Sequence, residues 1–169
     1  FELDPAVPAY AGRTGIELDV RETIPRFRLH AEGLVFGAIL LRNASGSLPA
    51  VARAVADDVV EIVPERPLTP GAWTLEADFS GRLGDRAVGL YRLESGGCSY
   101  VFSQFEADDA REAFPCFDEP GLKLPCRITV VIPVGNEVVS NSPVERDSSA
   151  GGRRTVVFAE TPPLPTYLV

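Results

Sequence analysis

Carboxylates and aromatic rings are concentrated in one stretch near the middle of the chain. Residues 104–120 read Q-F-E-A-D-D-A-R-E-A-F-P-C-F-D-E-P. The carboxylate of Glu106 could accept charge-assisted hydrogen bonds from an ammonium group, which carries three donors. The spacing alone favours a plainer interpretation, in which Glu106 is a surface residue that stabilises a following helix through the helix dipole. Gln104 would lie on the same side of a straight strand as Glu106, because it is two residues away.

Two other combinations contain catalytic residue types without a catalytic spacing. Asp118 and Glu119 are adjacent, whereas the paired carboxyl groups of glycosidases converge across roughly 5–9 Å. A proline-bounded turn at 115–120, with Asp118 bonded to its own backbone, is the expected structure. Cys116 and His30 show no spacing typical of a nucleophile and its base. We therefore expect a buried thiol at Cys116 and a hydrogen-bonded strand residue at His30, and we predict no catalytic residue in this chain.

The scarce residue types limit the cofactors that the chain could hold. It contains one histidine and no methionine, so a zinc site built on paired histidines is excluded. The missing methionine also predicts that Phe1 is an internal residue of a longer polypeptide. Cys98, Cys116 and Cys126 are too few, and odd in number, for the disulfide framework of a secreted domain. A reducing, cytoplasmic location is expected.

Charge and hydropathy exclude two classes of partner. Sixteen basic residues against 24 acidic ones give a net charge of −8, which repels the phosphate backbone of nucleic acids. No apolar run approaches the ~20 residues of a membrane-spanning helix, and no signal-peptide pattern opens the chain. We predict neither a nucleic-acid partner nor a membrane segment.

Alternation with a period of two predicts β-strands along most of the chain. It is clearest at 16–21, 26–31, 73–79 and 100–105, and further apolar runs lie at 33–41, 51–63, 127–133 and 155–160. Turn-forming clusters separate these runs at 43–49, 64–71, 80–85, 95–97 and 147–152. The pattern predicts an all-β, mainly antiparallel fold, built as a sandwich or a saddle of curved sheets. Residues 108–114 lack alternation and begin with acids, which indicates one short helix, and we predict a single domain over residues 1–169.

The acidic stretch closely resembles the hallmark of a known enzyme family. In the amino-terminal β domain of the aminopeptidase N family of zinc metallopeptidases, a Q-F/C-E triplet leads into A-R-x-x-F-P-C-F/W-D-E-P. Further similarities follow in the family's order: L-H-A at 29–31, G-L-Y-R at 89–92, S-N-S-P at 140–143, and the closing T-P-P-L-P-T-Y-L-V at 161–169. Together these landmarks cover most of the chain. L-P-C at 124–126 departs from the small residue and aromatic of many members, which suggests a subfamily.

The resemblance implies roles for two residues and for a missing partner. Glu106 would accept the free α-ammonium of a peptide substrate, and the amide of Gln104 would line the pocket for the first side chain. An amide of Gln104 bonded to neighbouring backbone is the alternative, and it stays open. The family's catalytic domain, with its G-x-M-E-N loop and the zinc-binding H-E-x-x-H helix, would follow Val169, and it is absent here. The chain alone should then bind no metal and cleave nothing. Two alternatives stay open: a stand-alone module that binds peptides or carbohydrate, and a scaffolding paralogue without catalysis.

Overall fold

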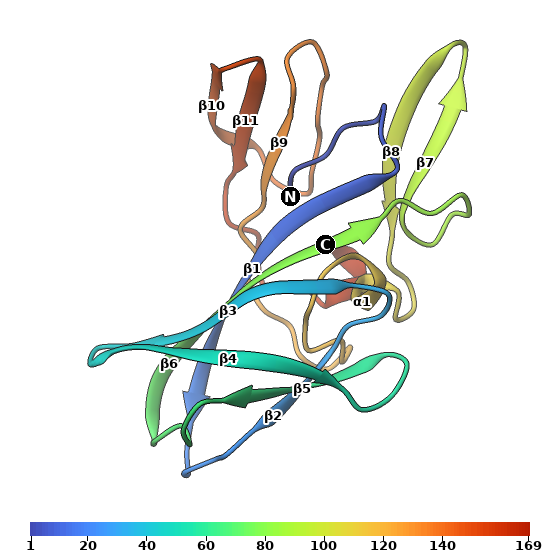
Figure 1. The fold of residues 1–169 in the computed structure, drawn as a ribbon. Coiled ribbons are helices and arrows are strands. Elements are labelled where there is room, and N and C mark those ends of the chain that lie inside the picture. Colours follow the sequence, from blue (N-terminus) through green and yellow to red (C-terminus); the bar gives the residue numbers. More distant parts are fainter. The chain divides into compact units, whose positions relative to one another are not determined.

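Antiparallel β-structure dominates the computed structural model, which describes all residues from Phe1 to Val169 (Figure 1). Its helices are α1 (Ala110–Ala113) and a single 3-10 turn, η1 (Thr166–Leu168). The predicted all-β class with one short helix is confirmed. Two compact units divide the chain: the curled-sheet unit (12–81 and 111–117) and the terminal unit (1–11, 82–110 and 118–169). The single domain stays a prediction.

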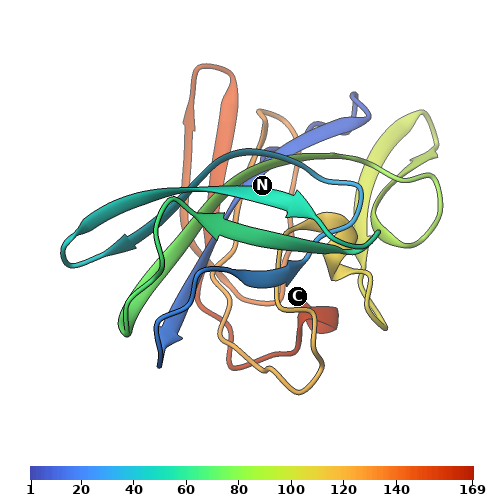
Figure 2. The ribbon, with the colours of Figure 1, turned by 60° about the horizontal axis from the view of Figure 1, so that its bottom comes forward.

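One six-stranded sheet forms the framework of the curled-sheet unit. Its strands lie in the order β1-β6-β3-β4-β5-β2, and Figures 1 and 2 show how the sheet curls around its own concave face. The bounds are β1 Ala9–Val20, β2 Phe27–His30, β3 Val35–Asn43, β4 Gly46–Ala54, β5 Val59–Pro64 and β6 Gly71–Arg82. Alternate side chains of neighbouring strands meet on the concave face, where Leu41 of β3 lies opposite Leu48 on one side and Leu75 on the other. These three residues are buried, so this face is the hydrophobic core.

The opposite face of the same strands carries charges in pairs. Arg13 of β1 donates to Asp78 of β6 at 2.6 Å, and Arg42 of β3 lies 3.0 Å from Glu76 of β6. The hydrogen bond from Arg13 lowers the pKa of Asp78 below its ordinary value. Pairs this exposed contribute little stability, because water screens them and holding two long side chains in one geometry costs entropy. Their effect is to keep the outer face hydrated while the inner face packs.

The terminal unit contains two smaller sheets. β7 (Gly89–Ser95) and β8 (Cys98–Gln104) form a two-stranded sheet, and β9 (Thr129–Pro133), β10 (Val144–Ala150) and β11 (Arg153–Phe158) form a three-stranded one in the order β10-β11-β9. Pairs of glycines connect both hairpins. Gly96 and Gly97, like Gly151 and Gly152, have positive φ angles, which suits the two-residue turn that matches the twist of antiparallel strands.

Three of the predicted turn clusters extend too far into strands. β6 continues to Arg82 and thus takes in residues 80–82 of the predicted turn at 80–85. β4 begins at Gly46, inside the predicted turn at 43–49, because the turn itself needs only Ala44 and Ser45. β10 occupies residues 144–150 and thus takes in four of the six residues of the predicted turn at 147–152. All seven of its side chains are exposed, so no apolar alternation marks it in the sequence.

A close approach between β1 and β6 makes one glycine indispensable. A Cβ atom added at Gly12 would lie 2.5 Å from Cζ of Phe79, whose ring is 4% exposed and cannot move aside. Gly12→Ala should therefore lower the free energy of unfolding by about 1–3 kcal/mol through overpacking. Gly15→Ala on the same strand is the matched control, because nothing lies within 4 Å of its added Cβ. Urea unfolding followed by circular dichroism measures both, and equal stabilities would contradict the close packing.

Candidate functional site

The end of β8 presents two polar side chains on either side of a buried ring. Gln104 is the last residue of β8 and pairs with Gly89 of β7. Phe105 is buried, and its carbonyl accepts the backbone N–H of Asp109 at 3.0 Å. Gln104 and Glu106 are both exposed. Burial of Phe105 thus fixes the local backbone while its two neighbours face solvent.

Neither of these polar groups is used within the chain. No side-chain hydrogen bond or ion pair involves the amide of Gln104 or the carboxylate of Glu106, although ion pairs are frequent elsewhere, as at Arg92–Glu94. The peptide bond between Glu106 and Ala107 is cis. A carboxylate without an internal partner keeps its full capacity to accept hydrogen bonds from a ligand. The roles of Gln104 and Glu106 in substrate binding stay predictions.

Aromatic residues precede Gln104 on its own face of the hairpin. The register pairs Phe102 with Tyr91 and Tyr100 with Leu93. Ring centroids lie 5.7 Å apart for Tyr91 and Phe102, and 6.1 Å apart for Tyr100 and Phe102. The predicted common face of Tyr100, Phe102 and Gln104 is confirmed by this register.

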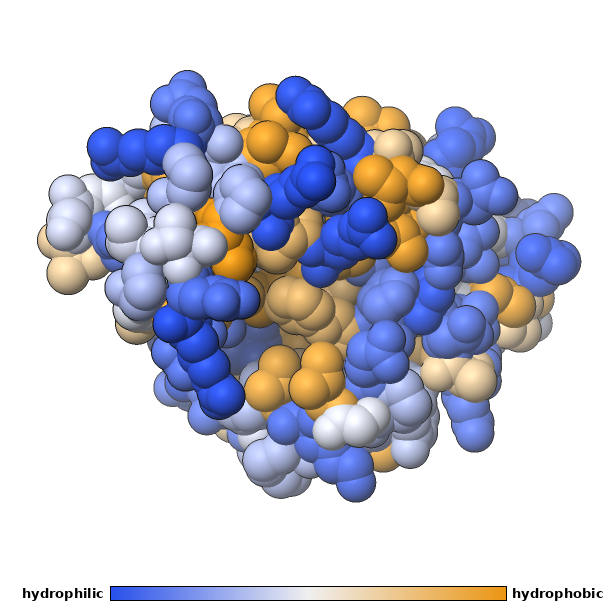
Figure 3. All heavy atoms as spheres, turned by 90° about the horizontal axis from the view of Figure 1, so that it is seen from below, coloured by the Kyte–Doolittle hydropathy of each residue, from blue (hydrophilic) through white to orange (hydrophobic).

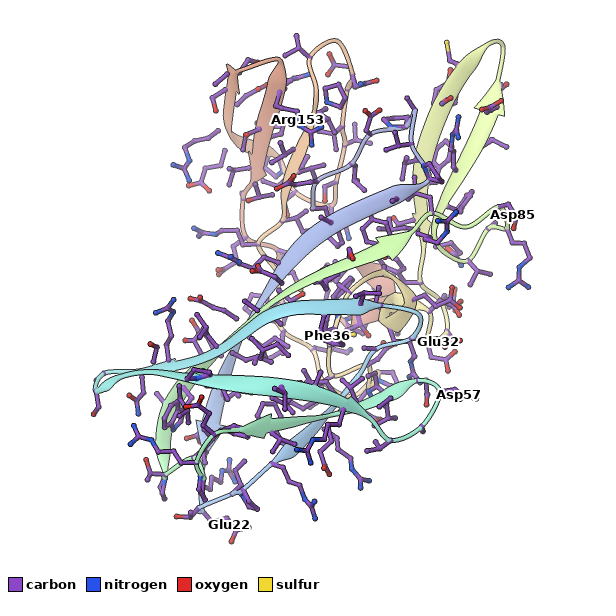
Figure 4. All side chains as sticks on the ribbon, in the orientation of Figure 1. Glu22, Glu32, Phe36, Asp57, Asp85 and Arg153 are labelled. Atoms are coloured by element: carbon purple, nitrogen blue, oxygen red, sulfur yellow. The ribbon has the colours of Figure 1, made fainter.

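The residues that follow Ala110 belong to the curled-sheet unit and are held there by polar contacts. Arg111 forms an ion pair with Asp58, and its carbonyl accepts the N–H of Glu32 at 2.9 Å. Figure 4 shows Glu32 and Asp57 at one end of the unit's sheet and Glu22 at the other. The sequence gives no sign of the pairing with Asp58, because the two residues are 53 positions apart.

Cys116 and His30 come together through their backbones. The N–H of His30 donates to the carbonyl of Cys116 at 2.9 Å, and the return bond measures 3.1 Å. This antiparallel bridge places Cys116 alongside the edge strand β2. Cys116 is buried, which agrees with the predicted role of a small apolar core residue. Phe117 follows it and packs against the core of the curled sheet.

Asp118 is a structural acceptor in the terminal unit. It is buried and accepts a hydrogen bond from the hydroxyl of Thr166 at 2.5 Å. The backbone carbonyl of the next residue, Glu119, closes a turn by accepting the N–H of Leu122 at 2.9 Å. The adjacent acids therefore have different environments. This arrangement supports the structural interpretation of the D-E-P motif over a catalytic pair.

Two shallow depressions lie on the curled-sheet unit, and no sequence motif indicated either. The smaller has a volume of about 300 Å³ and an apolar lining that includes Val20, Phe27 and Phe117. The larger, about 660 Å³, lies around Trp73 and Arg42. Figure 3 shows a hollowed face with hydrophobic residues inside it and both hydrophilic and hydrophobic residues at its rim. Gln104 and Glu106 line neither depression. Residues from separate strands form the depressions, so no local pattern could have revealed them.

The donor set of the chain does not suit a metal ion. No three His, Cys, Asp or Glu side chains come together in a group that could hold one. The three cysteines are free, with Cys98 exposed and Cys116 buried, and burial raises the pKa of the Cys126 thiol. None of the helices has the length and apolar character needed to span a bilayer.

Comparison with known proteins gives a consistent set of similarities. The family model described as the peptidase M1 N-terminal domain matches residues 1–168. Aminopeptidase M1-B of Oryza sativa subsp. japonica is 31% identical over 170 residues, which are 98% of this chain and 19% of the relative. Aminopeptidase A of Gloydius brevicauda is 33% identical over 181 residues, which cover 100% of this chain and 19% of the relative. Aminopeptidase M1 of Arabidopsis thaliana is 30% identical over 184 residues, which cover 100% of this chain and 21% of the relative. The chain spans about a fifth of the length of these relatives.

The ion pair between Asp58 and Arg111 should help to attach residues 111–117 to the curled sheet, beside the backbone hydrogen bonds of this segment. The Arg111 side chain is 11% exposed, so removal of Asp58 takes an ionic partner from a poorly hydrated charge. Asp58→Ala should lower the free energy of unfolding by about 1–3 kcal/mol. Asp57→Ala is the matched control, because this neighbouring acid is exposed and forms no ion pair. Thermal unfolding of both variants measures the change in stability. An equally small loss of stability in Asp58→Ala and Asp57→Ala would contradict the role of the Asp58–Arg111 pair.

Proposed function

The chain belongs to the peptidase M1 family as its N-terminal domain, and from this premise we propose that it anchors the free amino terminus of a peptide substrate for an aminopeptidase. The observation that carries the proposal is the exposed, unpaired carboxylate of Glu106, two residues after the end of β8. The whole enzyme would remove residues one at a time from peptide amino termini. This domain would position the substrate, and the bond-breaking groups would lie outside residues 1–169.

The chemistry of Glu106 suits an ammonium ligand. An α-ammonium group has three hydrogen-bond donors and a full positive charge. Hydrogen bonds between ionised partners are shorter and about twice as strong as neutral ones. In a peptide, only the first residue carries a free α-ammonium. A carboxylate at a fixed distance from the reacting centre therefore selects cleavage after the first residue, and such positioning lowers a barrier by several kcal/mol in favourable cases.

Gln104 suits a different part of the same ligand. Its amide is uncharged and offers both donors and an acceptor. Because Gln104 and Glu106 flank the buried Phe105, a substrate whose ammonium is bound by Glu106 would bring its first side chain close to Gln104. We propose that Gln104 lines the pocket for this side chain.

Zinc enters the proposal only through the rest of the enzyme. The expected zinc ion would be held by residues outside this chain, since no donor cluster for a metal ion is present within it. Its chemistry would be to polarise the scissile carbonyl and activate water. The residues of this chain would bind and orient the substrate while that chemistry takes place. Three free cysteines also lead us to propose a reducing, cytoplasmic location.

Removal of the Glu106 carboxylate tests the anchoring role. In the polypeptide encoded by the complete reading frame, Glu106→Ala should lower kcat/KM for peptides with a free amino terminus by ~10²-fold, the size of a lost charge-assisted contact. Glu145→Ala removes another exposed acid, from strand β10, and should leave the rate unchanged. Hydrolysis of aminoacyl anilides measures both. A Glu106→Ala enzyme with near wild-type rates would refute the proposal.

A change of charge at Gln104 tests the pocket. Gln104→Glu places a carboxylate where the first substrate side chain should lie, so it should raise the preference for lysyl over leucyl substrates by roughly tenfold, equivalent to about 1.4 kcal/mol. Ser103→Glu adds the same charge to the opposite face of β8 and serves as the control. The ratio of kcat/KM values for the two substrates is the readout. Equal ratios in both variants would remove Gln104 from the pocket.

A further inference from the structure

The β7–β8 hairpin has two faces of opposite character. The first, which we call the aromatic face, consists of Tyr91, Leu93, Tyr100 and Phe102, followed by Gln104 at its base. No charged side chain stands on it. The register places Arg92 and Glu94 on the second face, opposite Val101 and Ser99.

Large apolar side chains on the aromatic face are exposed, while part of the charged face is buried. Leu93 is 50% exposed, and Tyr100 and Phe102 are each 44% exposed. The Arg92 side chain on the charged face is only 28% exposed, and its Nε is buried without a hydrogen-bond partner. Exposed large apolar patches and buried polar atoms are the informative exceptions to the usual burial pattern. Glu94 on the charged face is 69% exposed, so solvent reaches both faces, and the exposed apolar side chains of the aromatic face are the exception that needs an explanation.

The limited stability of a two-stranded hairpin also indicates that the aromatic face has a partner. β7 and β8 form a two-stranded sheet of their own, joined to the preceding loop by a bridge between Tyr91 and Gly84. A two-stranded hairpin has little stability of its own in water, so covering its exposed apolar face would stabilise it. Cross-strand packing of Tyr91 on Phe102 and of Leu93 beside Tyr100 gives a continuous apolar surface. A surface of this composition has the aromatic character of the centre of a protein interface.

We propose that the aromatic face is the surface on which the remaining part of the same polypeptide, the part that contains the catalytic centre, docks onto this domain. The inference rests on the proposed function, because it takes the chain to be one domain of a larger aminopeptidase. The relatives supply the first argument for this occupant, since they are about five times longer than the region that they share with this chain.

Continuity with the candidate site supplies the second argument. Gln104 and Phe102 are two residues apart on one face of β8, so a protein surface that brings a catalytic centre close to Gln104 and Glu106 must pass over or beside Phe102. The occupant is therefore expected to be apolar where it meets Leu93, Tyr100 and Phe102. The absence of charge on this face also excludes attachment through ion pairs.

Solvent accessibility of a single introduced thiol tests the proposal. Leu93→Cys places the thiol on the aromatic face, and Val51→Cys places a control thiol at a site of matched exposure on β4, since Val51 is 53% exposed. Each variant is prepared as the 169-residue chain and as the polypeptide encoded by the complete reading frame. Alkylation by iodoacetamide is followed at each site by mass spectrometry. The native Cys98 pairs with Ser95 on the same face, so its alkylation measures the accessibility of this face without any substitution.

Docking predicts a specific pattern of rates. The thiol introduced by Leu93→Cys should react roughly tenfold or more slowly in the complete polypeptide than in the 169-residue chain, since it becomes accessible only when the contact opens. The control thiol of Val51→Cys should react equally in both. Equal rates at both sites would overturn the proposal, and so would a reading frame that ends at Val169. Protection that exists in the 169-residue chain and disappears on dilution would overturn it in favour of a second copy.

Activity measured on the same samples separates this inference from the proposed function. A complete polypeptide that hydrolyses aminoacyl anilides but shows no protection at Leu93→Cys would refute the docking surface and leave the anchoring function intact. A complete polypeptide that is protected but inactive would support the docking surface and refute the function.

Discussion

Side chains of a β-strand point alternately to opposite faces, and this geometry organises the chain from its largest sheet to its candidate site. In the curled sheet it sends Leu41, Leu75 and their neighbours into the core and leaves Arg42 and Glu76 outside, where they pair. At the end of β8 it places Gln104 on the same face as Phe102. The strand ends at Gln104, so the expected straight strand does not continue to Glu106. Phe105 is buried, and Glu106 lies exposed in the turn that follows.

Acidic side chains in residues 104–120 serve different purposes according to their surroundings. Asp118 is buried and accepts the hydroxyl of Thr166, so its hydrogen-bonding capacity is used to hold the terminal unit together. Glu119 lies beside it but contributes its backbone carbonyl to a turn. Glu106 is exposed and has no partner. An acid that stabilises the fold is recognised by its partners, and an acid available to a ligand is recognised by their absence. The motif's composition alone does not distinguish the two.

Much of the fold could be predicted because its strands are amphipathic. The alternation of Trp73, Leu75 and Ala77 identified β6, and the glycine pair at 96–97 identified the turn between β7 and β8. β10 was not identifiable, because both of its faces are exposed and its residues show no apolar period. The pairing of Arg111 with Asp58 could not be predicted from the sequence either. It depends on how the sheet curls, and that is set by contacts among six strands rather than by any local pattern.

The function of the candidate site, like the pairing of Arg111, could not be predicted from its residues alone. The residues alone favoured a bland surface role for Glu106, and only the resemblance to a family gave it a function. The structure adds that its carboxylate is unpaired, a condition that both a surface residue and an anchor satisfy. The residues next to Glu106 include the exposed polar side chains of Ser103, Gln104 and Asp108, while the preceding strand exposes Tyr100 and Phe102. An apolar surface beside an unpaired carboxylate is a poor arrangement for contact with water, and a reasonable one for contact with a protein and the ligand that it holds.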